Sequence, residues 1–150
     1  MTNVKTKLVE ALNELVDGKI EALRAAIADV SDSMKNDTKS SAGDKFETGR
    51  EMMQIELNNK QVQLNKQVQL KKELAQIDVN KQHTAIDFGS LIISNKGKFF
   101  ISVALGKVSC DNTEYFALSL ASPIGQALKG HKKGDTIVFN KQKIELLGIE

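Results

Sequence analysis

The feature that most constrains the fold is a long run of apolar residues at helical spacing near the start of the chain. From residue 16 onward these positions alternate between steps of four and three: Val16, Ile20, Leu23, Ile27, Val30 and Met34. This heptad alternation produces one narrow apolar seam, which is typical of a helix that packs against an antiparallel partner. An earlier run is offset by one position and comprises Val4, Leu8, Ala11 and Leu15. We therefore expect a long N-terminal helix.

A polar segment interrupts the seam, and a second helical stretch follows it. Residues 36–43 are small and polar, which favours a turn between two helices. The next heptad positions hold Phe46, Met53, Leu57 and Leu64. Lys60 and Gln67 stand where apolar residues would complete this second seam, so it is the weaker of the two.

A repeated hexapeptide lies in the second helical stretch. AsnLysGlnValGlnLeu occurs at residues 59–64 and again at 65–70. Six residues is not a helical period, so the apolar stripe re-registers to Leu70, Leu74 and Ile77. Gln, Lys and Leu are good helix formers, and no Gly or Pro occurs between Arg50 and His83. We expect this helix to run to about residue 83.

Charge is distributed unevenly along the predicted hairpin. Between residues 29 and 56 seven acids stand against four bases, so the tip is acidic. Beyond the tip the chain turns basic, with Lys60, Lys66, Lys71 and Lys72. These lysines form either a solvated face or a track that faces nucleic-acid phosphates. The net charge of the whole chain, +2, is too small to indicate nucleic-acid binding by itself.

The periodicity changes from helical to strand-like near His83. Residues rich in β-branched and aromatic side chains occur in five runs: 85–94, 98–104, 114–120, 136–140 and 143–149. Between the third and fourth runs, Ser122 can cap a short helix with Pro123 at its first position, and Gly130 can end it. The predicted fold is therefore α+β. It combines an antiparallel coiled-coil hairpin over 1–83, with its acidic tip around 35–48, and a small antiparallel sheet with one short helix over 84–150.

Several functional classes are disfavoured by composition. No apolar run reaches the length of a membrane-spanning helix, and no secretory signal is evident, so we expect a cytoplasmic protein. Cys110 is the only cysteine and has no nearby histidine, which argues against a disulfide and against acyl-transfer chemistry. His83 and His131 lie far apart in the sequence, which disfavours a zinc site.

Short motifs in the second half match a known family. They are Ser122-Pro123-Ile124-Gly125, Ala127-Leu128, Gly130-His131-Lys132 and Gly134-Asp135, with Gln76-Ile77-Asp78-Val79 at the end of the long helix. Together with the coiled coil, they resemble the Gre family of bacterial transcript-cleavage and elongation factors. The resemblance implies an FKBP-like C-terminal domain that binds RNA polymerase, with Ser122, Pro123, Ile124 and Gly125 as candidate contacts.

The resemblance also implies a role for the hairpin tip. In that family the coiled coil enters the secondary channel of the polymerase. Two tip acids there help to hold a catalytic Mg²⁺ and water, so that the polymerase cleaves its own backtracked RNA. The factor would thus be no enzyme. It would bind no stable cofactor, would share Mg²⁺ only in the complex, would contact nascent RNA indirectly, and would act as a monomer.

The family's tip reads Gly-Asp-x-x-Glu and then Asn-Ala-Glu-Tyr. Gly43-Asp44-Lys45-Phe46-Glu47 matches the first part, whereas Thr48-Gly49-Arg50-Glu51 replaces the second. Asp44 and Glu47 are therefore the candidate catalytic and Mg²⁺-associated acids, and Asp37 is a third candidate under another alignment. Two alternatives stay open: a regulator that occupies the channel without stimulating cleavage, and a coiled-coil interaction module unrelated to transcription.

Overall fold

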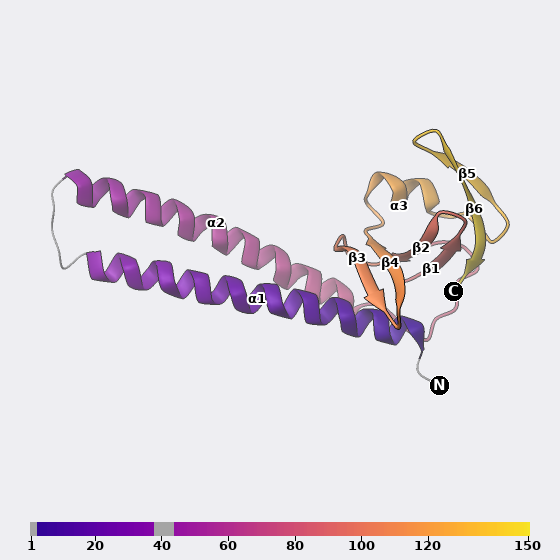
Figure 1. Ribbon diagram of the computed structural model, residues 1–150, viewed down its shortest axis with the longest axis horizontal. Helices are drawn as coiled ribbons and strands as arrows, with labels where there is room; N and C mark the ends of the chain where they lie inside the picture. Colours follow the sequence, from indigo (N-terminus) through magenta and orange to yellow (C-terminus); the bar gives the residue numbers. More distant parts are fainter. Residues whose placement is uncertain (1–2, 38–43) are drawn as a thin grey trace. The chain divides into compact units, whose positions relative to one another are not determined.

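The computed structural model describes residues 3–37 and 44–150 (Figure 1). Two long helices come first, α1 (Val4–Asp37) and α2 (Asp44–Ala75). Six strands and one short helix follow: β1 (Leu91–Ser94), β2 (Gly97–Ile101), β3 (Gly106–Cys110), β4 (Thr113–Leu118), α3 (Pro123–Leu128), β5 (Thr136–Phe139) and β6 (Gln142–Ile149). The predicted α+β fold, a helical hairpin followed by a small sheet with one short helix, is confirmed.

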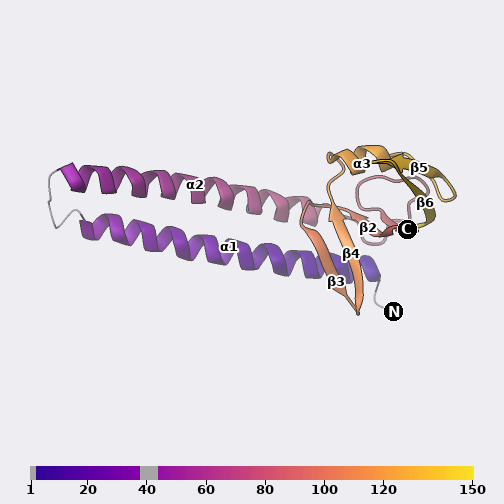
Figure 2. The ribbon, with the colours of Figure 1, turned by 45° about the horizontal axis from the view of Figure 1, so that its top comes forward.

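The chain forms two compact units. The shaft unit consists of residues Leu15–Lys71, in which α1 and α2 lie side by side and antiparallel (Figures 1 and 2). The sheet unit combines Met1–Glu14 with Lys72–Glu150, so it includes the start of α1 and the end of α2. The division after residue 83 that the sequence suggests stays a prediction.

The buried face of α1 is one continuous stripe. Its most buried members are Lys5, Leu8, Leu12, Val16 and Ile20, and the stripe continues through the half-buried Leu23, Ile27, Val30 and Met34. The heptad seam from Val16 onward is therefore found as predicted. The earlier run differs, because Leu12 is fully buried whereas Leu15 is 44% exposed. No offset occurs: a step of four residues keeps Leu8, Leu12 and Val16 nearly in line on a helix.

The second helix has few fully buried side chains, and it is shorter than predicted. Leu74 is fully buried, but Met53, Leu57 and Leu64 are only half-buried. The helix ends at Ala75 and not near residue 83. The cause is local, because the Asp78 carboxylate accepts the Asn80 N–H at 3.0 Å and the Asp78 carbonyl accepts the Lys81 N–H at 3.2 Å. Such a side-chain turn offers the backbone an alternative to the helix.

The sheet has the strand order β3-β4-β2-β1-β6-β5. Its neighbouring strands are antiparallel as predicted, except that β2 and β4 are parallel, with Phe99 opposite Phe116. This arrangement follows from β3, which is not among the strands predicted from the sequence. The chain leaves β2, forms the outer strand β3, and returns through a tight turn into β4, which therefore runs in the same direction as β2. Strand β6 pairs with β5 through its first half and with β1 through its second.

Two of the hairpin turns in the sheet have left-handed backbone at both turn residues. Asp111 and Asn112 join β3 to β4, and Asn140 and Lys141 join β5 to β6; all four have positive φ between 51° and 64°. These values are typical of type I′ turns, whose twist matches that of the flanking strands. The first predicted strand, 85–94, is shortened to β1 because Gly89 has φ 89° and the Ser90 hydroxyl accepts the Asp87 N–H.

One hydrophobic core cluster joins the sheet to α3. Its buried members are Ile86, Ile92, Phe99, Ile101, Leu128, Ile137, Ile144 and Leu146. Phe116 and Phe139 are packed against it, and the rings of Phe99 and Phe116 lie 6.0 Å apart. In the described ranges, no helix is long and apolar enough to cross a membrane.

Candidate functional site

The candidate tip acids lie at the ends of the two long helices. Asp37 is the last residue of α1, Asp44 is the first of α2, and Glu47 lies one turn into α2. Positions 44 and 47 are three residues apart and therefore share one face of the helix. The connecting residues 38–43, and the side chains of residues 37–47, lie outside the described part of the structure. The roles of all three acids stay predictions.

The donor set at the tip suits the metal that the resemblance implies. Mg²⁺ prefers oxygen ligands and often takes only one or two protein carboxylates when phosphates and waters supply the others. Asp44 and Glu47 would provide two carboxylates. Among the side chains that the structure describes, no group of three or more His, Cys, Asp or Glu residues could hold a metal ion.

The four lysines predicted to face nucleic acid do not lie on one side of α2. At about 100° per residue, Lys60 and Lys71 share a side, whereas Lys66 and Lys72 point elsewhere. Lys71 forms an ion pair with Asp17 of α1 at 2.5 Å, and Lys60 is half-buried. A single phosphate-facing track along α2 would therefore contain only some of these lysines, and their role stays a prediction.

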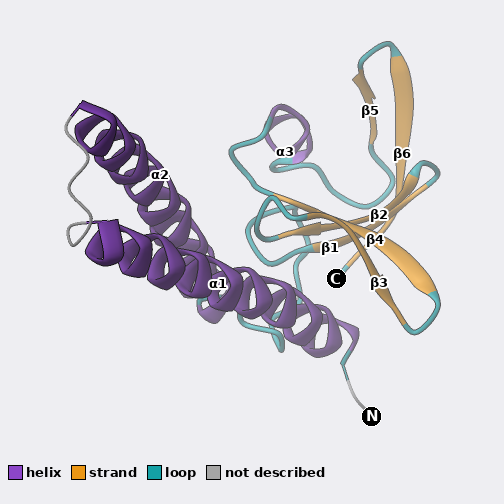
Figure 3. Ribbon diagram, turned by 60° about the vertical axis from the view of Figure 1, so that its left-hand side comes forward, coloured by secondary structure: helices purple, strands orange, loops and turns teal. Residues whose placement is uncertain are grey.

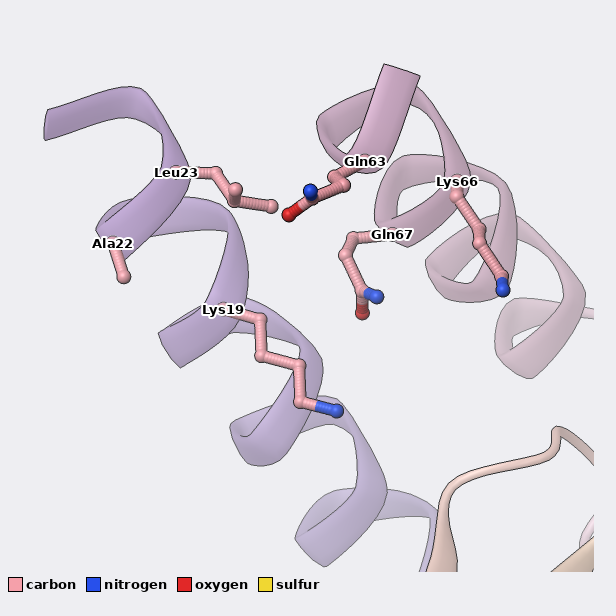
Figure 4. A pocket seen from close by; sticks show the side chains of 6 residues that line it. All are labelled: Lys19, Ala22, Leu23, Gln63, Lys66 and Gln67. Carbon is pink, nitrogen blue, oxygen red and sulfur yellow. The ribbon is translucent and has the colours of Figure 1, made fainter. Parts of the chain in front are cut away.

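A groove of about 350 Å³ lies between α1 and α2 in the shaft unit. Figure 4 shows Gln63 reaching toward Leu23 and Gln67 pointing into the space between the helices. Lys19, Ala22 and Lys66 complete the lining. The Gln67 side-chain oxygen is buried and has no hydrogen-bond partner within the described structure. The groove therefore contains a polar defect at Gln67, a seam position that lacks an apolar residue.

The Ser-Pro-Ile-Gly motif forms the start of α3, as predicted. Ser122 is the N-cap residue: its hydroxyl oxygen accepts the Gly125 N–H at 3.1 Å, and its O–H donates to the Ser119 carbonyl at 2.7 Å. Pro123 occupies the first helical position, where a missing N–H costs nothing. These bonds fix the angle at which the chain enters α3.

Gly125 is required by a close backbone approach. A Cβ atom on this residue would lie 2.2 Å from the Ser119 carbonyl oxygen and 2.9 Å from that of Leu120. Ile124 is half-buried against the core cluster, whereas Pro123 is exposed. Three of the four motif residues are thus explained by the fold itself, and Pro123 is the one whose side chain is free for a partner.

A buried polar cluster in the sheet unit was not anticipated from the sequence. Lys5 is only 2% exposed, and its Nζ donates to the Lys81 carbonyl at 2.9 Å, while the Asn3 amide donates to the Val79 carbonyl. His83 is buried nearby, and burial, followed by the charges of Lys5 and Lys81, lowers its pKa. The burial of Lys5 could have been predicted from its position in the sequence, because Lys5 precedes Leu8 by three residues and so falls on the buried face of α1.

Comparisons with known proteins add two structural matches. No family model matches the chain, and no curated protein matches it. The crystal structure of GreA factor homolog 1 (Gfh1) of Thermus thermophilus is 19% identical, with a TM-score of 0.37, covering 93% of this chain and 95% of that one. A second structure, of the transcription factor Gfh1, is also 19% identical, with a TM-score of 0.40 and 93% of each chain covered. By name, both belong with the family that the sequence resembles.

Proposed function

We propose that this chain is an RNA-polymerase-binding factor of the Gre type that acts through the secondary channel. The observation that carries the proposal is the combination, in one chain, of the α1–α2 hairpin with a small sheet whose α3 opens on the Ser122-capped Ser-Pro-Ile-Gly turn. In the Gre family these two parts have separate tasks, channel entry and polymerase binding. Pro123 supports the second task because it presents an exposed, rigid surface at the start of α3.

The tip acids support a role in RNA cleavage. Asp44 and Glu47 share one face at the start of α2, which is separated from the end of α1 by six residues. Bound there, Mg²⁺ would stabilise charge on the phosphate and activate a water molecule. The two carboxylates would orient the ion, while the polymerase and the RNA supply its other ligands.

A non-cleaving regulator is the second candidate function. The observation that favours it is the segment Thr48-Gly49-Arg50-Glu51, which replaces the second part of the family's tip motif. Such a chain would occupy the channel and compete with other factors without positioning a metal ion.

The decisive experiment measures shortening of nascent RNA in a stalled, backtracked complex of the cognate polymerase. We expect Mg²⁺-dependent cleavage with the parent chain and its loss in the double variant Asp44→Ala, Glu47→Ala. Glu51→Ala, Glu56→Ala is the matched control, because it removes two exposed acids of the same helix outside the candidate pair. Loss in both double variants would reject the acid assignment. Binding without any cleavage by the parent would establish the non-cleaving regulator.

Binding itself is tested with Pro123. Pro123→Ala removes an exposed ring from the first helical position and should leave α3 folded, because Ser122 still caps the helix. We expect weaker binding to polymerase, whereas Lys96→Ala, an exposed position in the β1–β2 turn, should bind normally. No binding by the parent, together with self-association, would favour the coiled-coil interaction module. That alternative is supported by the exposed Met52, Ile55 and Val62 on α2.

A further inference from the structure

The two outer strands of the sheet differ in how they are protected. An outer strand exposes unpaired backbone groups, and proteins commonly shield it with charged residues, especially lysine, or with proline. Strand β3 carries Lys107, which pairs with Glu114 at 3.5 Å. Strand β5, Thr-Ile-Val-Phe, contains no charged residue and no proline or glycine. Its edge is therefore open to a further strand.

The register of the β5–β6 hairpin identifies the free backbone groups. The Leu146 N–H donates to the Asp135 carbonyl at 2.9 Å, so Asp135 faces β6. Hydrogen-bonded positions alternate along an antiparallel pair, so Ile137 and Phe139 also face β6, while the N–H and C=O groups of Thr136 and Val138 point the other way. Across the described ranges, neither Thr136 nor Val138 makes a backbone hydrogen bond outside the ladder.

The side chains at this edge are accessible as well. Val138 is 66% exposed, and Thr136 is exposed as well. Helix α3 packs on the opposite face, because Leu128 and Ile137 belong to the same core cluster. Figure 3 shows that the turn end of the β5–β6 hairpin stands clear of α3. A strand added beside β5 would thus find two donor–acceptor pairs and an exposed apolar side chain.

The charges around β5 determine which strand fits. Four exposed lysines flank it: Lys132, Lys133, Lys141 and Lys143. The nearest acids are Asp135 and Glu145, and the Asp135 carboxylate is already engaged by the Lys132 N–H at 2.9 Å and by His131 at 3.2 Å. A second copy of this chain would bring two sets of lysines together, which opposes pairing of β5 with itself. An acidic strand would instead be attracted.

We infer that the open edge of β5 is a docking site for an extended, acidic segment of a partner protein, which adds to the sheet as a further strand. Main-chain hydrogen bonds to Thr136 and Val138 provide the attachment, and the flanking lysines select for negative charge. The site lies on the β5–β6 hairpin and uses none of the residues of the Ser122 turn.

The test uses the full chain and a short capped peptide that alternates glutamate with valine. We expect the peptide to slow amide hydrogen exchange at Thr136 and Val138, because both N–H groups become hydrogen-bonded. A peptide of equal length that alternates lysine with valine is the control. Equal protection by the lysine peptide, or protection without peptide that grows with protein concentration, would overturn the proposal, the latter because a second copy would then occupy the edge.

Two variants separate the backbone and charge contributions. Val138→Pro removes an outward N–H and leaves the ladder to β6 intact, since that N–H makes no bond within the hairpin. The double variant Lys141→Glu, Lys143→Glu leaves every backbone group in place and should weaken peptide binding at least about tenfold, as like charges then face each other. Lys96→Glu is its matched control and should have little effect. Unchanged affinity in the lysine double variant would contradict the proposal even if Val138→Pro did not fold.

Discussion

At the scale of single residues, Gly125 is the glycine of the sheet unit with the least room for a side chain. We expect Gly125→Ala to lower the free energy of unfolding by about 1–3 kcal/mol or more, the usual range for forcing an extra carbon into a packed site. The added Cβ would meet backbone carbonyls of Ser119 and Leu120, which cannot rotate away as a flexible side chain could. Chemical denaturation monitored by circular dichroism measures the change.

Gly18 supplies the control for this substitution. It lies inside α1, and a Cβ atom there would meet nothing within 4 Å. Gly18→Ala should therefore stabilise the chain, by roughly 0.5–1 kcal/mol, because alanine is the better helix former. Equal effects of the two substitutions would show that the close approach at Gly125 is not what constrains it.

We expect the stability of the folded chain to depend on pH through His83. Its pKa in the folded chain lies below the ordinary value, because burial and then Lys5 and Lys81 disfavour the charged ring, and Asp87 and Asp78 offset this only partly. As the pH falls below about 6.5, the unfolded chain binds a proton at this residue before the folded chain does. The contribution of His83 to stability should therefore be present at neutral pH and be lost as the pH falls.

The measurement is the midpoint of thermal unfolding between neutral and mildly acidic pH. His83→Gln should remove this part of the decline, while His131→Gln, which leaves His83 in place, should retain it. An identical decline in the parent chain and in His83→Gln would assign the pH dependence to carboxylates elsewhere.

At the scale of elements, the shaft unit contains a defect that can be repaired. The Gln67 side-chain oxygen is buried at a seam position without a partner in the described structure. We expect Gln67→Leu to raise the free energy of unfolding by about 1 kcal/mol, because the cost of an unsatisfied polar atom disappears. Gln69→Leu, at an exposed position of the same helix, should change stability little. A loss of stability in Gln67→Leu would mean that the amide has a partner in solution.

The helices and strands also show which parts of the fold could be predicted from the sequence pattern and which could not. Heptad spacing from Val16 to Met34 predicted the seam of α1 because helical burial repeats with the helix period. The cap at Ser122 was predictable because capping depends on a few adjacent residues. The end of α2 was not, since α2 ends in a segment with no Gly or Pro, and the turn in which Asp78 accepts the Asn80 N–H follows three residues later. Strand β3 was missed because Gly-Lys-Val-Ser-Cys contains only one β-branched residue and no aromatic residue, and its pairing with β4 depends on the turn at Asp111 and Asn112.

The candidate site likewise contains one feature that the sequence predicted and one that it could not predict. The sequence predicted the Ser122 turn, and its geometry now assigns Ser122, Ile124 and Gly125 to the fold and leaves Pro123 exposed. Lys71 shows the limit of prediction from sequence, because its ion pair with Asp17 joins residues that are far apart in the chain. A local pattern cannot distinguish such a lysine from one that faces a partner.

At the scale of the whole molecule, the sheet unit is discontinuous in sequence, and this has a consequence for stability. Residues 1–14 contribute the buried Lys5, Leu8 and Leu12, and residues 72–83 contribute the buried Leu74 and Ile77. Burial of one large apolar side chain is worth about 1.5–3 kcal/mol, and whole domains are stable by only about 5–15 kcal/mol. We therefore expect residues 84–150 alone to be largely unfolded.

A chain that keeps both parts of the sheet unit should fold without the shaft. The ion pair between Asp17 and Lys71 shows that α1 and α2 lie side by side where the shaft unit ends, so a short Gly/Ser linker can replace residues 15–71. This shortened chain should unfold cooperatively and should keep the slow-exchanging amides of β1, β2 and β6, while 84–150 should not. Thermal unfolding and amide hydrogen exchange compare the two. If 84–150 proved equally stable, the sheet would not need the helix ends, and the boundary after residue 83 would be the correct one.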